Sequence, residues 1–247
     1  MIHSTEFPVF PQSYRVLSGS ALKTLALTAM LCDHIAKVLL KNIPAMTTPL
    51  FTLFGSDFTV YFFMISFGRI AFPIYAFLIT EGCRHTRDRR RYCLGLLCFA
   101  LLSEVPWNLV HFNTVFSLQK QNVFFTLFLG SAAICLCEKF SGDIVRRSAV
   151  LISLAAFAYV LRCDYGLKGF AFILAVYILR PDGIMQAVIG ACLLSAPLRG
   201  GMAFIPINMY NGERGYIGSK PLKYVFYAVY PVHMLILWFL KLRFFGY

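Results

Sequence analysis

Apolar residues in this chain occur in long runs that are separated by short polar segments. Eight runs can be drawn, over residues 22–40, 61–81, 92–110, 122–138, 146–162, 167–180, 184–207 and 222–242. A helix that crosses a membrane needs about 20 mostly apolar residues, and most of the runs come close to that length. The pattern therefore predicts one all-α domain over residues 1–247, a polytopic membrane protein of about eight transmembrane helices with short loops.

Three segments fit this pattern less simply. The runs at 146–162 and 167–180 are short, so their helices are either tilted, bounded differently or re-entrant. Residues 43–60 are apolar but contain two prolines, which predicts an interfacial loop. Residues 1–20 lack a long apolar run and are predicted to be a cytoplasmic segment rather than a signal peptide, with the helical bundle following at 21–243.

The composition agrees with a membrane protein. Hydrophobic residues make up 59% and charged residues 14%, against about 45–50% and about 25% in soluble domains. The 25 Phe and 13 Tyr also exclude a disordered chain. The net charge of +12 would suggest nucleic acid in a soluble protein, but basic residues also set membrane topology. We therefore expect a lipid bilayer and no nucleic acid as partner, and the absence of CxxC pairs predicts no metal site.

Basic residues predict the orientation. Residues 82–92 carry five arginines, which places this loop in the cytoplasm, and an even number of crossings then places both termini there as well. The segment 199–223 disagrees, because its Arg199 and Arg214 would lie outside. Either the seventh run is not a simple crossing or these residues bind a ligand.

The first run contains ionisable residues that are costly inside a membrane. Asp33 and His34 lie well within it, and His34 shares a helical face with Lys23 and Lys37. An adjacent carboxylate raises the basicity of an imidazole, so Asp33 and His34 are predicted to form a general base. The alternative is a polar stripe that holds helices together.

Other polar residues within the runs extend this candidate site. Arg69 lies mid-run and is expected to face an anion or to pair with Asp33. Glu104 lies on one face with polar neighbours, and Asn122 is expected to cap a helix, with substrate contact as a second choice. His233 lies deep in the last run.

A family resemblance emerges from several segments in order. LKTLALTAMLCDHIAKVLL resembles the opening of TraX proteins, as do GRIAFPIYAFLITEGCRHTRDRRRYCLGLLCFALLSEVPWNL, QNVFFTLFLG, CDYGLKG, YNGERG and KYVFYAVYPVHMLIL. The resemblance implies a multi-pass protein of the bacterial inner membrane that acetylates pilin. It also implies a layout similar to that of transmembrane acyltransferases, some of which carry Arg-x10-His where this chain has Lys23 and His34.

The predicted function is acyl transfer, most simply of acetyl from cytosolic acetyl-CoA to an amine or hydroxyl of pilin or another envelope acceptor. The alternatives are a proton-coupled transporter and a non-catalytic component of a conjugation or pilus system. The predicted catalytic residues are His34, Asp33, Arg69, Glu104, Tyr230 and His233. Acetyl-CoA contacts are predicted at Lys23, Glu81, Arg84, His85, Arg87, Arg89, Arg90 and Arg91, and acceptor contacts at Asn122, Asp164, Asn211 and Lys223. Direct attack and an acyl-histidine intermediate both fit.

Overall fold

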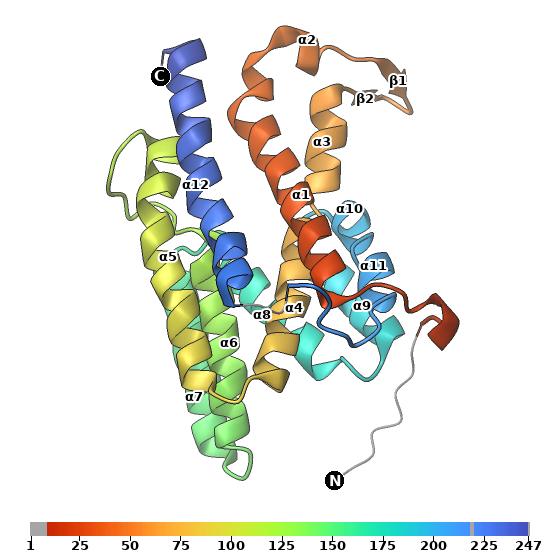
Figure 1. Ribbon diagram of the computed structural model, residues 1–247, viewed down its shortest axis with the longest axis vertical. Coiled ribbons are helices and arrows are strands. Elements are labelled where there is room, and N and C mark those ends of the chain that lie inside the picture. Colours follow the sequence, from red (N-terminus) through yellow and green to blue (C-terminus); the bar gives the residue numbers. More distant parts are fainter. Residues whose placement is uncertain (1–8, 218–219, 247) are drawn as a thin grey trace.

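The computed structural model describes residues 9–217 and 220–246, which fold as a helical bundle with one small hairpin (Figure 1). The α-helices are α1 (Gly19–Val38), α2 (Pro44–Thr47), α3 (Val60–Gly68), α4 (Ala71–His85), α5 (Arg89–Phe112), α6 (Val123–Lys139), α7 (Ile144–Val160), α8 (Gly166–Ile178), α9 (Gly183–Leu193), α10 (Pro197–Gly201), α11 (Phe204–Asn208) and α12 (Lys220–Phe245). Two short 3-10 helices are η1 (Gln12–Tyr14) and η2 (Leu40–Asn42), and the strands are β1 (Phe51–Leu53) and β2 (Ser56–Phe58).

The bundle has two distinct ends. The arginine-rich loop at residues 82–92 lies at one end together with the start of α1, and we call this the basic end. Residues 39–59 and the C-terminal end of α5 lie at the opposite end, which we call the far end. These two names separate the cavities described below.

Most of the long helices begin at residues that the local sequence specifies. Six helices have a polar N-cap whose side chain accepts a backbone N–H of the first turn, which removes one of the unpaired donors there. These caps are Ser18, Thr59, Asp88, Asn122, Asp143 and Asp182.

The second apolar run is broken at Arg69, between α3 and α4. Pro73 is the third residue of α4, a position where its missing N–H costs no intrahelical hydrogen bond. Gly68 lies against Asp33 of α1 so closely that a side chain at Gly68 would overlap the Asp33 backbone and Cβ. The glycine therefore allows α1 and α3 to pack in contact.

The seventh apolar run does not cross the bundle as a simple helix. Arg180, just before α9, pairs with Glu81 at the basic end. A Cβ on Gly183 at the start of α9 would lie 2.6 Å from Asn208 at the end of α11, so the chain leaves and returns at one level. Residues 184–207 thus form a re-entrant hairpin of α9, α10 and α11. Gly190 and Gly201 permit this close return, because a side chain on Gly190 would overlap Phe204 and one on Gly201 would crowd Ala191.

The re-entrant segment changes the position of the C-terminus. Tyr210 pairs with Leu17 just before α1, so α12 starts from the basic end. Near its other end Trp238 donates to Asn113 and Lys241 donates to the carbonyl of Val110, both at the far end. The start of α1 and the C-terminal end of α12 therefore lie at opposite ends of the bundle, whereas the sequence predicts both termini on one side of the membrane.

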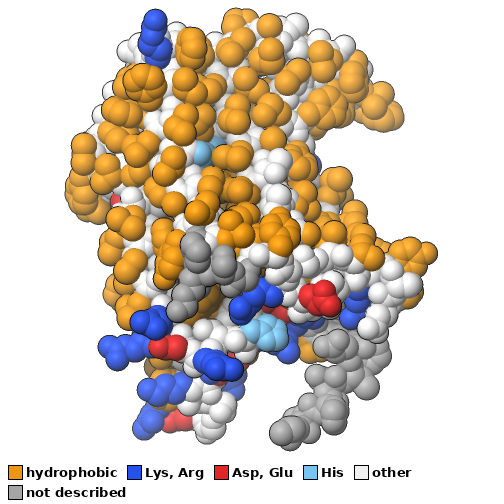
Figure 2. Space-filling view, in the orientation of Figure 1, with side chains coloured by type: hydrophobic (Ala, Val, Ile, Leu, Met, Phe, Trp, Pro, Cys, Tyr) orange, Lys and Arg blue, Asp and Glu red, His pale blue; other side chains and the backbone are white. Residues whose placement is uncertain are grey.

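The exterior is that of a membrane protein. Three helical segments are long and apolar enough to span a membrane: Val60–His85, which comprises α3 and α4, Arg89–Phe112 and Tyr224–Phe245. Figure 2 shows apolar side chains over most of one face, with the charged side chains gathered mainly toward the basic end. Large exposed apolar residues on α5, α7 and α12 include Leu102, Ile152 and Phe239, as expected where lipid replaces water.

Residues 43–60, predicted to be a loop, contain regular structure. After α2 the chain forms an antiparallel hairpin in which Phe51 lies opposite Phe58 and their rings stack. Phe54 and Gly55 both have positive φ, as a tight two-residue turn requires. The Phe54 side chain is 97% exposed, so this far-end hairpin presents an aromatic tip to its surroundings.

Candidate functional site

The centre of the bundle holds a pair of histidines from the first and last helices. The Nδ1 atom of His34 on α1 lies 2.7 Å from Nε2 of His233 on α12. The two rings are nearly parallel, with an interplanar angle of 6° and centroids 5.0 Å apart. Residues almost two hundred positions apart are therefore joined by one short hydrogen bond.

The hydrogen bonds specify how the protons are arranged on this pair. His233 Nδ1 lies 2.8 Å from the carbonyl oxygen of Val229, which only accepts, so Nδ1 carries a proton. In a neutral His233 the Nε2 atom is then an acceptor, and His34 Nδ1 must donate to it. The lone pair of a neutral His34 consequently resides on its Nε2 atom. A backbone carbonyl and a second histidine thus orient His34 as a base or nucleophile.

Tyr230 completes the cluster. Its ring meets the His34 and His233 rings edge-on, at centroid distances of 5.9 and 5.5 Å. The Tyr230 hydroxyl is buried and has no hydrogen-bond acceptor among the described residues. Because an unpaired buried donor is costly, this O–H is suited to bind an oxygen atom of a ligand.

A large cavity of about 660 Å³ opens at the basic end and reaches this cluster. Gly19 and Met30 both line it, so it extends about 16 Å along α1 at 1.5 Å per residue. Its mouth carries charged and polar side chains, while its inner wall is aromatic and aliphatic and includes Tyr230. The mouth residues are Lys23, Glu81, His85, Tyr210 and Arg214. Burial raises the pKa of the Tyr210 phenol, so it stays a donor at neutral pH.

A second, smaller cavity of about 350 Å³ lies toward the far end. Four cationic side chains and one carboxylate line it, together with the tip of the re-entrant hairpin at residues 193–195. The charged residues are Lys37, Arg69, Lys120, Asp164 and Lys168. Phe72 lines both cavities and stacks on Tyr165 at a centroid distance of 3.6 Å, so these rings separate the two spaces.

His34 lies on α1 between the two cavities. Met30 lines the large cavity and Lys37 lines the small one. His34 follows Met30 by four residues and precedes Lys37 by three, so all three share one helical face. Lys23, His34 and Lys37 lie on one face of α1, as their spacing predicts, and this face borders the large cavity before His34 and the small cavity after it.

Asp33 does not contact His34 in the way that the sequence suggested. Its carboxylate pairs with Lys37, one turn further along α1, and its second oxygen is buried without a partner. Adjacent helical residues point about 100° apart, so Asp33 faces α3 while His34 faces α12. The described residues contain no Asp33–Arg69 ion pair either. The Nε atom of Arg69 is buried and has no hydrogen-bond partner among them.

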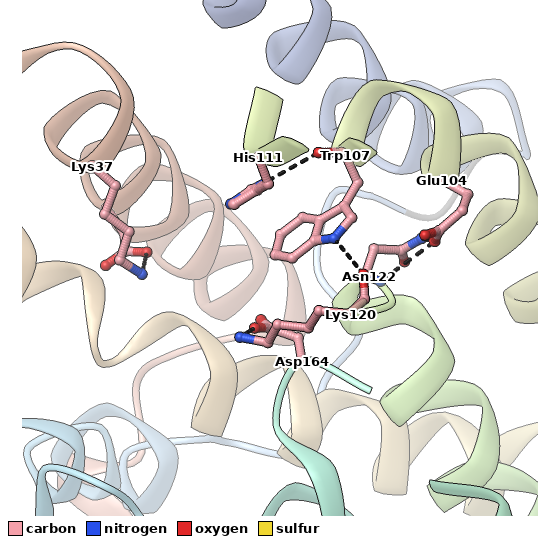
Figure 3. Close-up of polar contacts among 8 residues, drawn as sticks. Lys37, Glu104, Trp107, His111, Lys120, Asn122 and Asp164 are labelled. Carbon is pink, nitrogen blue, oxygen red and sulfur yellow. Dashed lines mark hydrogen bonds and ion pairs between the residues drawn. The ribbon is translucent and has the colours of Figure 1, made fainter. Parts of the chain in front are cut away.

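Glu104 and Asn122 connect α5 to the start of α6. The Asn122 amide donates to Glu104 and to the carbonyl of Ala100, and its oxygen caps Phe124, which uses all of its hydrogen-bonding groups but one. Asn122 is fully buried, as expected for a cap and interhelical contact. In Figure 3 this pair lies beside Trp107, which donates to the Lys120 carbonyl at 2.9 Å.

Asp164 and Lys120 meet across two loops of the far end. Their side chains are 2.6 Å apart, and Figure 3 shows the pair below the Trp107 ring. The isolated bridge between Gln121 and Cys163 joins the same two loops. Asp164, predicted to contact an acceptor, therefore lies in the wall of the small cavity and is paired with Lys120.

The predicted CoA contacts separate into two groups. Arg84 and His85 line a third cavity of about 310 Å³ at the basic end, where Glu81 pairs with Arg180 at 2.9 Å. The remaining four arginines line none of these three cavities in the described part of the chain. Arg89 pairs with Glu138, and Arg87, Arg90 and Arg91 are exposed.

Asn211 lies in a turn that the sequence analysis placed outside. Its side chain accepts from the backbone of Glu213, and the carbonyls of Glu213 and Arg214 accept from Gly19 and Ser20 at the start of α1. The turn therefore belongs to the basic end, where Asn211 lines the third cavity. The side chain of Lys223 lies outside the described residues.

Beyond Arg214, for which ligand binding was one of two alternatives, several residues of the two cavities were not predicted as site residues. Arg214 at the large cavity and Tyr165 and Lys168 at the small one belong to the short segments YNGERG and CDYGLKG. Those segments are polar and contain glycine, and this composition was the only sequence feature that could have indicated a site there. Lys120 has no such signal, because its position depends on contacts with Trp107 and Asp164.

Comparison of the sequence with known proteins identifies a family and a relative. The family model described as "TraX protein" matches residues 18–241. The "Probable fimbrial assembly protein FimC, serogroup H1" of Dichelobacter nodosus is 28% identical over 250 residues, which cover 89% of this chain and 94% of that protein. No solved structure matches the chain. Since the family model spans nearly the whole chain, including both histidine-bearing helices, the protein belongs to the TraX family.

Proposed function

We propose that this TraX protein is a membrane-embedded acyltransferase that moves an acyl group, most simply acetyl from acetyl-CoA, to an amine or hydroxyl. The observation that carries the proposal is the position of His34 on the α1 face that joins two cavities of different chemistry. A transferase with two substrates needs two approaches to one reactive group, and on this face Met30 of the large cavity and Lys37 of the small one lie within four residues of His34.

The chemistry would use His34 and Tyr230. The Nε2 atom of His34 removes the proton of the acceptor amine or hydroxyl. At the same time the lone pair of the acceptor nitrogen or oxygen attacks the thioester carbonyl. The Tyr230 hydroxyl, which lacks an acceptor, donates to the oxyanion that forms. Collapse of the intermediate breaks the carbon–sulfur bond, and the CoA thiolate takes the proton from His34. Transfer through an acyl-His34 intermediate uses the same two groups.

The large cavity would hold the acyl-CoA. Its mouth carries Lys23 and Arg214, which suit phosphate groups, and its apolar inner wall suits an extended thioester arm. Arg84 and His85 in the neighbouring cavity extend the cationic surface. The exposed Arg87, Arg90 and Arg91 are explained by topology alone.

The membrane topology follows from the basic end. By the positive-inside rule, the basic end faces the cytoplasmic side of a bacterial inner membrane, where acetyl-CoA is available. Seven crossings, by α1, α3–α4, α5, α6, α7, α8 and α12, together with the re-entrant hairpin, then put the C-terminus on the outer side. Acceptors from the envelope would enter the small cavity. The name of the Dichelobacter nodosus relative favours a fimbrial subunit or another envelope molecule as acceptor.

Incubation of the purified protein with radiolabelled acetyl-CoA tests the proposal. An acyltransferase releases CoA and transfers label to an acceptor or to His34. A proton-coupled transporter, which two opposed cavities also fit, would move protons in vesicles without consuming acetyl-CoA. Absence of both CoA release and label transfer, with envelope extract supplied as acceptor, would contradict the proposal.

A further inference from the structure

The small far-end cavity has an excess of positive charge that the fold does not neutralise. Two of its four cations are paired, Lys37 with Asp33 and Lys120 with Asp164. Neither Arg69 nor Lys168 has a carboxylate partner within residues 9–217 and 220–246. Lys168 is exposed, but Arg69 is only partly exposed, and a cation without a counterion inside a membrane protein is expensive. The cavity therefore carries positive charge at Arg69 that the described residues do not neutralise.

Arg69 is the most constrained of these cations. It lies at the break between α3 and α4, where Gly68 fixes the backbone against α1. Its Nε atom is buried without a hydrogen-bond partner among the described residues. An arginine that still has unused donors in a fixed planar group matches a carboxylate or a phosphate, which accepts two parallel hydrogen bonds.

Two other cations of the cavity are positioned by contacts within the fold. Lys120 is held by Asp164 and, through its carbonyl, by Trp107 (Figure 3). Lys37 lies three residues from His34 on the same face of α1. A volume of about 350 Å³ accommodates a small polar group and not a folded segment of another protein.

We infer that the acyl acceptor carries an anionic group, a phosphate or a carboxylate, which the far-end cavity binds through Arg69 and Lys168. The inference rests on the proposed function for the identity of the bound molecule as acceptor. Binding of the anion would place a neighbouring amine or hydroxyl near His34, on the α1 face that Lys37 and His34 share. The anion would come from a small free molecule or from a phospholipid headgroup.

Three probes with one primary amine but different ends test this site on the full-length purified protein in neutral detergent. They are ethanolamine, O-phosphoethanolamine and β-alanine. We expect both anionic probes to bind at least about tenfold more tightly than ethanolamine, the scale of one charged hydrogen bond, as measured by calorimetry and by the shift in Tm. Equal binding of all three, or binding of none, would overturn the inference.

Matched variants assign the binding to the cavity. Lys168→Gln changes an exposed residue, so the variant should fold normally. It should lower the affinity for both anionic probes by about tenfold. Arg69→Gln should weaken them further, and Arg69→Lys should recover part of the loss. Arg199→Gln removes a charge that lines none of the three cavities and should leave binding unchanged. Equal effects of Lys168→Gln and Arg199→Gln would contradict the assignment.

Two further experiments distinguish the two sources of the anion and separate the proposed anion site from the proposed acyl transfer. Competition by phosphatidylethanolamine in nanodiscs would indicate a lipid headgroup, and undiminished probe binding there would indicate a free molecule. His34→Ala should retain anion binding, since His34 does not line the cavity. Anion binding without any acyl transfer would reject only the proposed function, whereas acyl transfer to all three probes at equal KM would reject only the anion site.

Discussion

The two cavities that approach His34 differ in nearly every property. The basic-end cavity is nearly twice as large, extends along α1, and has an aromatic and aliphatic inner wall behind a charged mouth. The far-end cavity is small, and its wall carries four cations, of which only Lys37 and Lys120 are held by salt bridges among the described residues. One space suits a long molecule with an anionic head, and the other suits a compact anionic one.

This difference explains why a single helix face carries so many polar residues. Lys23, His34 and Lys37 lie at whole-turn spacings on α1, one at the mouth of the large cavity, one between the cavities and one in the small cavity. A polar stripe that only held helices together would be buried against partners along its length. Here its two ends face cavities, so the stripe follows a path through the bundle.

A topology measurement tests whether the two cavities face opposite sides of the membrane. The two cavities open to opposite compartments only if the basic end and the far end do. Reporter fusions at residue 88 should be active in the cytoplasm, and fusions at the C-terminus should be active outside, because α12 runs from the basic end to the far end. Cytoplasmic signals from both fusions would contradict the re-entrant segment at residues 184–207.

A large but incomplete loss is expected from His233. His233→Ala removes the acceptor of the His34 Nδ1 proton, so the base remains but loses its orientation. We expect kcat to fall at least about tenfold, yet less than with loss of a general base itself. His233→Gln supplies an amide oxygen at this position and should recover part of the rate. Equal activity of both variants and the parent protein would show that the pair has no role in transfer.

Substitutions in the basic-end cavity should change the affinity for acetyl-CoA rather than the rate of transfer. Lys23→Gln combined with Arg214→Gln removes two cations from its mouth, and KM for acetyl-CoA should rise by about tenfold with little change in kcat. As a control, Arg90→Gln with Arg91→Gln removes equal charge from exposed positions outside the cavities. Equal KM changes in both double variants would remove this cavity as the CoA site.

The smallest effect is expected at Asp33. Its carboxylate pairs with Lys37 and does not contact the His34 ring. Asp33→Asn should change kcat by less than about fivefold, the scale of a partly exposed ion pair. A loss as large as that of His233→Ala would restore the carboxylate–imidazole pair that the sequence suggested. Steady-state rates of the two variants in the same detergent decide between them.

The sequence specified the helices better than the site. The apolar runs correspond closely to α1, α5 and α12, and polar caps such as Ser18 and Asp88 determine where helices begin. For the run at 184–207 the sequence left two alternatives open, and the structure agrees with the one in which this run is not a simple crossing. Hydropathy reports how apolar a segment is, but whether it crosses or returns depends on contacts such as that between Gly183 and Asn208.

Within the site, the sequence identified His34 but not its partner. Neighbours along a chain are easily taken as partners, which favoured Asp33 as the partner of His34. In a helix such neighbours diverge, and the actual partner, His233, comes from the opposite end of the sequence. Lys120 and Asp164 meet only because two loops pair at Gln121 and Cys163, which no local pattern indicates.

Acetyl transfer by the His34→Ala variant tests the central claim most directly. His111→Ala is the matched control, because it removes a second imidazole of the bundle, one that is exposed and lies 3.0 Å from the carbonyl of Trp107 rather than against His233. With radiolabelled acetyl-CoA and equal amounts of folded protein, His34→Ala should lose at least about 100-fold in CoA release and label transfer, while His111→Ala keeps the parent rate within a few-fold. Near-normal transfer by well-folded His34→Ala protein would contradict the account.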